Sequence, residues 1–175
     1  MKYNMPGIDI IDLSDPLLHK REKGAIRLIT HPQDQFPPDE NEFWYLWTAK
    51  EAIFKAHRDL TMFNPKNIQV IITKSEDTLK FESGDIKGEL KRIDDAIIAI
   101  ADKELENVTY KILERKTDSE SSEIRDEVVK HFQKEHNLDV KVESDGDGLP
   151  IISYHKLPLS FTHHARYMAF AYHSF

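Results

Sequence analysis

The carboxylate of Asp9 lies in a segment where burial would cost free energy unless another group compensates for its lost hydration. Asp9 lies in the run GIDIID with isoleucines on both sides, a pattern typical of a buried strand. So apolar a strand excludes a carboxylate unless a partner or a cation offsets the lost hydration. We therefore treat Asp9 as a candidate functional residue, whose carboxylate needs either a polar partner or a cation. The alternative is a strand-end aspartate that caps a turn.

Glu51 and Lys55 form a second candidate pair, one helical turn apart in the segment ENEFWYLWTAKEAIFKAHR. This segment has good helix formers and no internal glycine or proline, which predicts a helix of about five turns. Trp44 and Trp47 fall on the same side of that helix, so we expect this side to be covered by other residues. The alternative is an ordinary surface salt bridge, worth about 0.3–0.5 kcal/mol.

Other polar motifs favour simpler interpretations. His163 and His164 are adjacent on a predicted strand, so their side chains should point to opposite faces and not chelate one ion together. The nine histidines include no HExxH pattern, which argues against a zinc site. The run DGDGLP resembles a calcium loop, but Gly148 and Pro150 break the required ligand order and indicate a tight turn.

Length and composition exclude several classes of protein. With 175 residues, 39% of them hydrophobic, the chain can bury a sizeable core, and we predict one domain over residues 1–175. The net charge of −7 argues against a nucleic-acid partner. The absence of cysteine excludes disulfides and thiolate catalysis and fits a cytoplasmic location. The sequence shows neither a signal peptide nor an eighteen-residue apolar stretch, so we expect no membrane partner.

The elements that must position these residues alternate between helix and strand patterns. GIDIIDL predicts a strand, and Ser14-Asp15-Pro16 then predicts the start of a helix that carries the most basic stretch, Lys20, Arg21, Lys23 and Arg27. After the long helix comes a β-rich middle section, about 68–143, which we expect to form an antiparallel meander followed by one amphipathic helix. Closing strands follow, and no internal repeat is evident. The pattern predicts an α+β fold, with an antiparallel sheet packed against a long helix.

Three blocks, taken in order, resemble the 4′-phosphopantetheinyl transferase superfamily, in particular its short single-lobe branch typified by holo-acyl-carrier-protein synthase. GIDIID is similar to the family's G-[IV]-D-[IV]-x-[ED] opening, and WTAKEAIFKA closely fits its W/F-x-x-K-E-A-x-x-K-A helix. LSFTHH, at residues 159–164, resembles the closing [IL]-S-[IFL]-[ST]-H-x strand. DGLP is similar to a turn that often precedes that strand. The resemblance implies the 4′-phosphopantetheinyl transferase-like fold.

The resemblance also implies a reaction, in which a serine hydroxyl of an acyl or peptidyl carrier protein attacks the β-phosphate of coenzyme A. Adenosine 3′,5′-bisphosphate is released. It implies that Asp9 and Glu51 bind Mg²⁺, which suits an ion that prefers few carboxylates plus phosphates and water. Lys55 would contact a phosphate or the leaving group, Lys50 and His163 would bind nucleotide phosphates, and Glu51 or a metal-bound water would act as general base. Asp12 is either a further ligand through water or a structural cap.

The resemblance gives the basic stretch at Lys20, Arg21, Lys23 and Arg27 a use, since carrier proteins, including those of fatty-acid biosynthesis, present an acidic recognition helix. Short members build their site between subunits of a trimer, whereas double-length members build it between two lobes of one chain. Because no lobe precedes the GIDIID block here, we expect a homo-oligomer, either dimer or trimer. Two other functions fit the same carboxylates. A Mg²⁺-dependent phosphohydrolase is disfavoured by the lack of a phosphate-binding glycine loop, and a non-catalytic module for coenzyme A or a carrier protein is disfavoured because Asp9, Lys50, Glu51 and Lys55 occur together.

Overall fold

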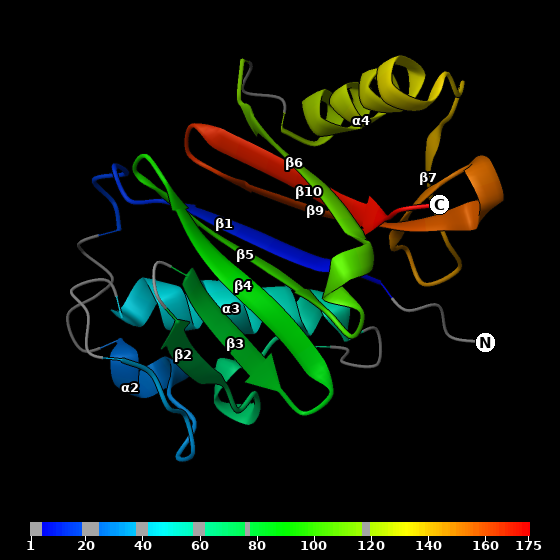
Figure 1. The fold of residues 1–175 in the computed structure, drawn as a ribbon. Helices are drawn as coiled ribbons and strands as arrows, with labels where there is room; N and C mark the ends of the chain where they lie inside the picture. Colours follow the sequence, from blue (N-terminus) through cyan, green and yellow to red (C-terminus); the bar gives the residue numbers. More distant parts are fainter. Residues whose placement is uncertain (1–4, 19–24, 38–41, 58–61, 76–77, 117–119) are drawn as a thin grey trace.

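The structure, a computed structural model, describes residues 5–18, 25–37, 42–57, 62–75, 78–116 and 120–175, and in these it contains two five-stranded antiparallel sheets (Figure 1). The first sheet has the order β1-β5-β4-β3-β2. Its strands are β1 (Gly7–Asp12), β2 (Ile71–Ser75), β3 (Thr78–Ser83), β4 (Ile86–Ile93) and β5 (Ala96–Asp102). The short helix α2 (Ile26–Ile29) and the long helix α3 (Glu42–Ala56) lie between β1 and β2 in the chain. We call residues 5–102 the first half.

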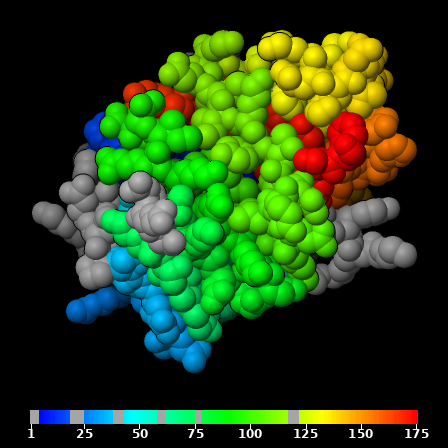
Figure 2. All heavy atoms as spheres, in the orientation of Figure 1, coloured from blue at the N-terminus to red at the C-terminus, as the bar shows by residue number. Residues whose placement is uncertain are grey.

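The second sheet repeats this strand order as β6-β10-β9-β8-β7. Its strands are β6 (Val108–Glu114), β7 (Val142–Ser144), β8 (Pro150–Ile152), β9 (Leu157–His164) and β10 (Tyr167–His173). Helix α4 (Glu120–His136) follows the first strand of this sheet, as α3 follows β1. Residues 108–173 form the second half, and Figure 2 shows it in contact with the first half above the green strands. The halves share a topology although their sequences show no repeat.

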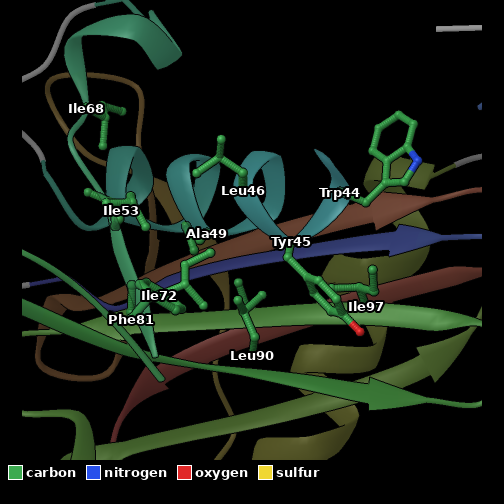
Figure 3. Packing of buried hydrophobic residues seen from close by; sticks show 14 of the residues in the cluster. Trp44, Tyr45, Leu46, Ala49, Ile53, Ile68, Ile72, Phe81, Leu90 and Ile97 are labelled. Carbon is green, nitrogen blue, oxygen red and sulfur yellow. The ribbon is translucent and has the colours of Figure 1, made fainter. Parts of the chain in front are cut away.

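Three hydrophobic cores stack the elements in four layers, α3, first sheet, second sheet and α4 (Figure 1). The largest core lies between α3 and the first sheet, where Tyr45 and Ala49 point toward Leu90 and Ile97 (Figure 3). α4 covers the second sheet with Ile124, Val128 and Phe132, whose spacing of four residues confirms the predicted amphipathic helix. Ile8 and Ile10 of β1 belong to the core between the sheets, so β1 is buried on both faces.

Close contact between β1 and α3 depends on a glycine. A Cβ atom on Gly7 would collide with the backbone carbonyl of Ala52 in α3. Glycine at this position lets the helix lie directly on the strand, as expected where backbones approach closely. The opening glycine of the GIDIID block therefore brings the strand that carries Asp9 next to the helix that carries Glu51 and Lys55.

The α+β class and the sheet packed against a long helix are confirmed, and two details differ from the sequence predictions. The predicted meander ends at β5, because β6 pairs with β10 in the second sheet. A helix predicted to begin at Ser14-Asp15-Pro16 does not start there: residues 13–14 and 16–18 form turns, and α2 begins at Ile26. Asp12 accepts hydrogen bonds from Ser14, which favours a local turn over a helix. Lys20, Arg21 and Lys23 lie outside the described residues.

Candidate active site

The structure brings Asp9, Glu51 and Lys55 together, as the sequence predicted. Lys55 Nζ lies 2.9 Å from Asp9 Oδ1 and 3.3 Å from Glu51 Oε1. It also donates to the backbone carbonyl of Ile8, at 3.1 Å. Glu51 and Lys55 share one face of α3, since they are one turn apart, and β1 runs beneath that face. Two carboxylates and one ammonium thus form a compact group with a net charge of −1 when all are ionised.

Asp9 is the most deeply buried member of this group, with 3% of its surface exposed. Burial raises its pKa to about 6, and the nearby Glu51 carboxylate acts in the same direction, whereas Lys55 and the Thr162 hydroxyl oppose the rise. Thr162 donates to Asp9 Oδ1 at 2.8 Å. Asp9 Oδ2 is buried and has no hydrogen-bond partner within the described residues. A buried carboxylate oxygen without a partner is costly in an apolar setting, which fits an atom that holds a cation when the site is in use.

Lys55 stays protonated at neutral pH. Burial alone would lower its pKa, but the Asp9 and Glu51 carboxylates outweigh burial and raise the pKa above its usual value. Its side chain is 21% exposed, so the ammonium remains accessible from the pocket. A permanent positive charge at this place can neutralise one oxygen of a phosphate group.

The second half completes the site through β9. β1 is the edge strand of the first sheet and lies against β9, whose side chains satisfy backbone groups of that edge. Ser160 Oγ accepts from the amide of Ile8 at 3.3 Å, and His164 Nδ1 accepts from the amide of Asp12 at 3.2 Å. With Thr162 on Asp9, every second residue of the LSFTHH block bonds to β1. The polar residues at alternate positions of this block therefore all face β1.

A pocket of about 610 Å³ opens between the two halves at this place. Its first-half wall contains Asp9, Glu51, Lys55 and an apolar section that includes Leu28, Trp44 and Trp47. Its second-half wall is made of Ile124 and of the β9 residues Phe161, Thr162, His163 and His164. Trp44, Trp47, Glu51 and Lys55 follow one stripe of α3 and line this pocket, where Trp44 is buried and Glu51 and Lys55 are partly exposed. The pocket is polar at the carboxylates and aromatic toward the start of α3.

The structure places Lys50 outside this pocket. Its side chain is fully buried, and Nζ donates to Asp34 Oδ2 at 2.6 Å and to the carbonyls of Ile29 and Pro65 at 2.8 and 2.9 Å. These three bonds use all the donors of a lysine. The predicted contact with nucleotide phosphates therefore does not fit this geometry. Lys50 instead anchors the segment after α2 to α3.

His163 is exposed and lines the pocket, where it was predicted to meet phosphates. Asp12 is fully buried at the end of β1, and both its oxygens accept from Arg166, which agrees with the structural alternative for this residue. Burial acts to raise the pKa of Asp12, but hydrogen bonds from Arg166 and Ser14 hold it well below its usual range. Arg27, on α2 near the pocket, is exposed.

Two residues of the second half were not identified from the sequence. Phe161 forms part of the pocket wall, and the guanidinium of Arg125 on α4 lies over its ring, 5.7 Å from the centroid. An arginine held on an aromatic ring beside a pocket is suited to meet phosphate groups. Phe161 is the third residue of the LSFTHH block, but no role followed from that position. Arg125 belongs to none of the three blocks, and its only sequence signal was its position on the predicted amphipathic helix, next to the apolar Ile124.

Comparison with known proteins agrees with this geometry. Residues 5–101 match the family model described as the 4′-phosphopantetheinyl transferase superfamily. The chain therefore belongs to the 4′-phosphopantetheinyl transferase superfamily, whose members transfer phosphopantetheine from coenzyme A to carrier proteins. The match corresponds to the first half and includes Asp9, Glu51 and Lys55. No curated protein and no solved structure matches the chain.

The carboxylates present suit magnesium better than a transition metal. Among the described residues no three His, Cys, Asp or Glu side chains gather as a metal cluster, and no helix there is long and apolar enough to cross a membrane. Mg²⁺ is commonly held by only one or two carboxylates together with substrate phosphates and water. Asp9, whose Oδ2 has no hydrogen-bond partner among the described residues, forms such a set with Glu51.

Proposed function

We propose that this chain is a Mg²⁺-dependent transferase of the holo-acyl-carrier-protein synthase type. It would move the 4′-phosphopantetheine group of coenzyme A to a serine of an acyl or peptidyl carrier protein. The main support is the pairing of Asp9 and Glu51 with Lys55 at the polar end of a pocket between the halves. A transferase must hold an anionic pyrophosphate, and this group offers one cation of its own and two ligands for another.

Asp9 and Glu51 would hold Mg²⁺, with Asp9 Oδ2, which accepts no hydrogen bond from the described residues, as a ligand atom. When bound, the ion supplies positive charge that neutralises the pyrophosphate and stabilises the charge that develops on the leaving oxygen. Without a cation, the net charge of −1 on the three side chains would repel coenzyme A. This charge balance is the physical reason why we expect no activity in the absence of a divalent metal.

The side chains of the chain itself then account for the remaining steps. Glu51, with 29% of its side chain exposed, accepts the proton of the carrier serine hydroxyl. The serine oxygen bonds to the β-phosphorus of coenzyme A, and the bond from that phosphorus to the bridging oxygen breaks. Adenosine 3′,5′-bisphosphate leaves with the electron pair, and Lys55 stabilises its negative charge. His163 lies on the second-half wall, where its ring can hydrogen-bond a phosphate oxygen, and Arg125, held over the ring of Phe161, supplies positive charge beside that wall.

The carrier protein would approach over α2. Arg27 and Leu28 are exposed there, with Leu28 66% exposed and at the pocket wall. An acidic helix of a carrier protein would meet this basic and apolar surface. The basic residues Lys20, Arg21 and Lys23 belong to the same proposal by sequence alone, since they lie outside the described residues. A cytoplasmic location, where coenzyme A and apo carrier proteins meet, belongs to the same proposal. The expected homo-oligomer rested on a site built between subunits, but here both walls of the pocket belong to one chain, so the proposed site does not need a second copy.

Intact-mass spectrometry tests the proposal directly. An apo acyl carrier protein incubated with this protein, coenzyme A and Mg²⁺ should gain one phosphopantetheine group, about 340 Da, and the gain should vanish with EDTA. Glu51→Ala should abolish the gain without unfolding the chain, since Glu51 is partly exposed. No gain with several carrier proteins, although the protein binds coenzyme A, would leave a non-catalytic binding module as the function.

A further inference from the structure

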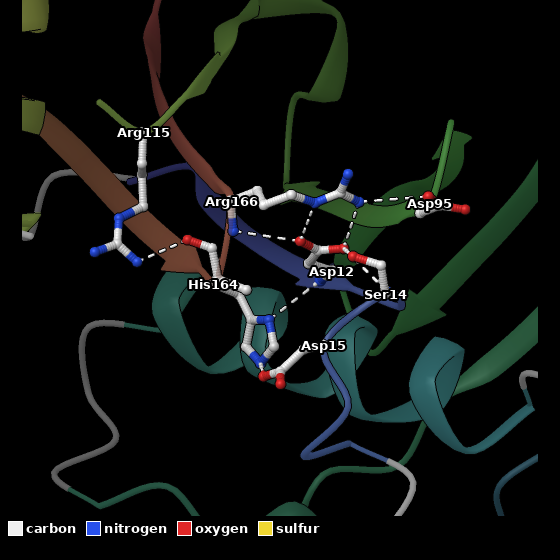
Figure 4. Close-up of polar contacts among 8 residues, drawn as sticks. Asp12, Ser14, Asp15, Asp95, Arg115, His164 and Arg166 are labelled. Atoms are coloured by element: carbon white, nitrogen blue, oxygen red, sulfur yellow. Dashed lines mark hydrogen bonds and ion pairs between the residues drawn. The ribbon is translucent and has the colours of Figure 1, made fainter. Parts of the chain in front are cut away.

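An ion pair joins the two halves at the edge of the pocket. Asp12 ends β1 in the first half, and Arg166 lies in the turn between β9 and β10 in the second (Figure 4). Arg166 Nε donates to Asp12 Oδ2 at 2.8 Å, and Nη2 donates to Oδ1 at 2.9 Å. This bidentate geometry is the most specific that an arginine and a carboxylate can form. Asp12 is fully buried, so the pair is shielded on one side from solvent.

Further contacts hold the same turn. The Arg166 amide donates to Asp12 Oδ2 at 3.3 Å, and the Asp12 amide donates to His164 Nδ1 at 3.2 Å. Ala165 has a φ of 44°, an unfavourable value for a residue with a Cβ atom. Arg115 Nη1 donates to the carbonyl of Ala165 at 2.7 Å. A strained residue persists where its surroundings fix it, and here the surroundings include the end of β1.

The turn directly follows pocket residues. Thr162 and His163 precede it on β9, while Asp9 precedes Asp12 by three residues on β1. Both strands therefore run from the ion pair into opposite walls of the pocket. A shift of the turn along β1 would move Thr162 relative to Asp9, to which it donates at 2.8 Å.

The geometry points to Asp12 and Arg166 as a positioning pair that fixes the second-half wall of the pocket relative to Asp9 and Glu51. The effect of this pair on catalysis rests on the proposed function. The geometry also assigns Asp12 a role other than metal binding. Oδ1 already accepts from the Ser14 amide, the Ser14 hydroxyl and Arg166, and Oδ2 accepts twice from Arg166.

A double-mutant cycle tests the pair. We expect Arg166→Gln, Asp12→Asn and the double variant each to raise the KM for coenzyme A about tenfold, because a displaced binding wall weakens substrate contacts. The double variant should be no worse than Arg166→Gln, since that variant already lacks the contact with Asp12 and the 3.4 Å contact between Arg166 and Asp95. kcat and the Mg²⁺ concentration for half-maximal rate should stay close to wild type. Arg92→Gln, at an exposed arginine on β4, is the matched control and should change none of these values.

Two results would overturn the inference. One is a higher Mg²⁺ requirement in Asp12→Asn but not in Arg166→Gln, which would make Asp12 a metal ligand. The other is a KM for Arg166→Gln equal to that of Arg92→Gln. Hydrogen exchange of the free protein gives a readout that needs no activity, because the amides of residues 162–168 should exchange faster in Arg166→Gln than in Arg92→Gln. If the wild type modifies no carrier protein, the proposed function fails, and the exchange rates still decide whether the pair fixes this wall.

Discussion

The first and second halves of the chain share a strand order but differ at the strand that begins each sheet. In the first half Asp9 pairs with Ala99, the fourth residue of β5. In the second half the fourth residue of β10, Phe170, pairs with Lys111. The position that carries a buried carboxylate in one half thus carries a lysine in the other. β1 is buried throughout, whereas β6 is half-buried along most of its length. A shared topology therefore does not create a second copy of the site.

The largest expected effect on activity separates Asp9 from Lys111, which occupy equivalent positions in the two halves. Asp9→Asn and Glu51→Gln should each lower kcat/KM for carrier modification by about 10³-fold, because each removes a ligand charge and Glu51→Gln also removes the base. Lys111→Ala should stay within about twofold of wild type. Steady-state kinetics with apo carrier protein measure both. A strong loss in Lys111→Ala would contradict the view that this position has no part in the reaction.

Stability should also differ between the halves, because they anchor their helices differently. Lys50 ties α3 to Asp34 in a fully buried ion pair, while Tyr172 OH lies within 2.9 Å of the Nε2 atoms of His131 and His136 on α4. Lys50→Met should cost about 3–5 kcal/mol, because it leaves Asp34 buried without its cation. Tyr172→Phe should cost about 1–2 kcal/mol. Urea unfolding gives both values. Equal costs would show that the buried pair of Lys50 and Asp34 contributes no more to stability than the hydrogen bonds of Tyr172.

The two aspartates of β1 should give opposite responses to pH. Asp9 has a pKa of about 6 in the folded chain against 3.8 when unperturbed, so the folded state binds its proton more tightly. The Asp9 contribution should therefore raise the free energy of unfolding by about 2 kcal/mol as the pH falls from 7 to 4. Asp9→Asn should be more stable than wild type at pH 7 and should lose this contribution. Asp12→Asn should be less stable, because its depressed pKa makes the charged form stabilising. Thermal unfolding measured from pH 7 down to about pH 2 compares all three proteins, because the Asp12 contribution is lost only as the pH falls below the unperturbed pKa of 3.8.

A smaller effect tests the contact between the halves at the site itself. Thr162→Val keeps the shape of the side chain but removes the hydroxyl that donates to Asp9, and should lower kcat/KM about tenfold. Thr162→Ser retains the hydroxyl and should remain within about threefold of wild type. If valine and serine behave alike, the hydrogen bond from the second half has no role in orienting Asp9.

The sequence predicted the parts of the site that depend on local pattern. The isoleucines around Asp9 indicated a buried strand, which is confirmed. The spacing of Trp44, Trp47, Glu51 and Lys55 indicated that they share one helix face, and that face lines the pocket. Both features arise within a single element, where periodicity alone fixes which side chains share a face.

Features that depend on distant segments could not be predicted in the same way. Lys50 is adjacent to Glu51 in sequence, but it points to Asp34, Ile29 and Pro65, and no local pattern reveals these partners. The repeated topology was missed because β1 and β6 have different residues at equivalent positions. Hydrogen bonds from Ser160 and Thr162 to β1 span more than 150 residues, so they appear only in the folded chain.

The short connection between the halves has a further consequence. Only residues 103–107, which include a single 3-10 turn, separate the end of β5 from the start of β6. So short a tether keeps the two walls of the pocket at a high effective concentration, on the order of millimolar or more. The walls can thus meet within a single chain. Dilution of the protein does not separate them. Because one chain carries both walls, a mutation in one wall is always expressed together with the other wall.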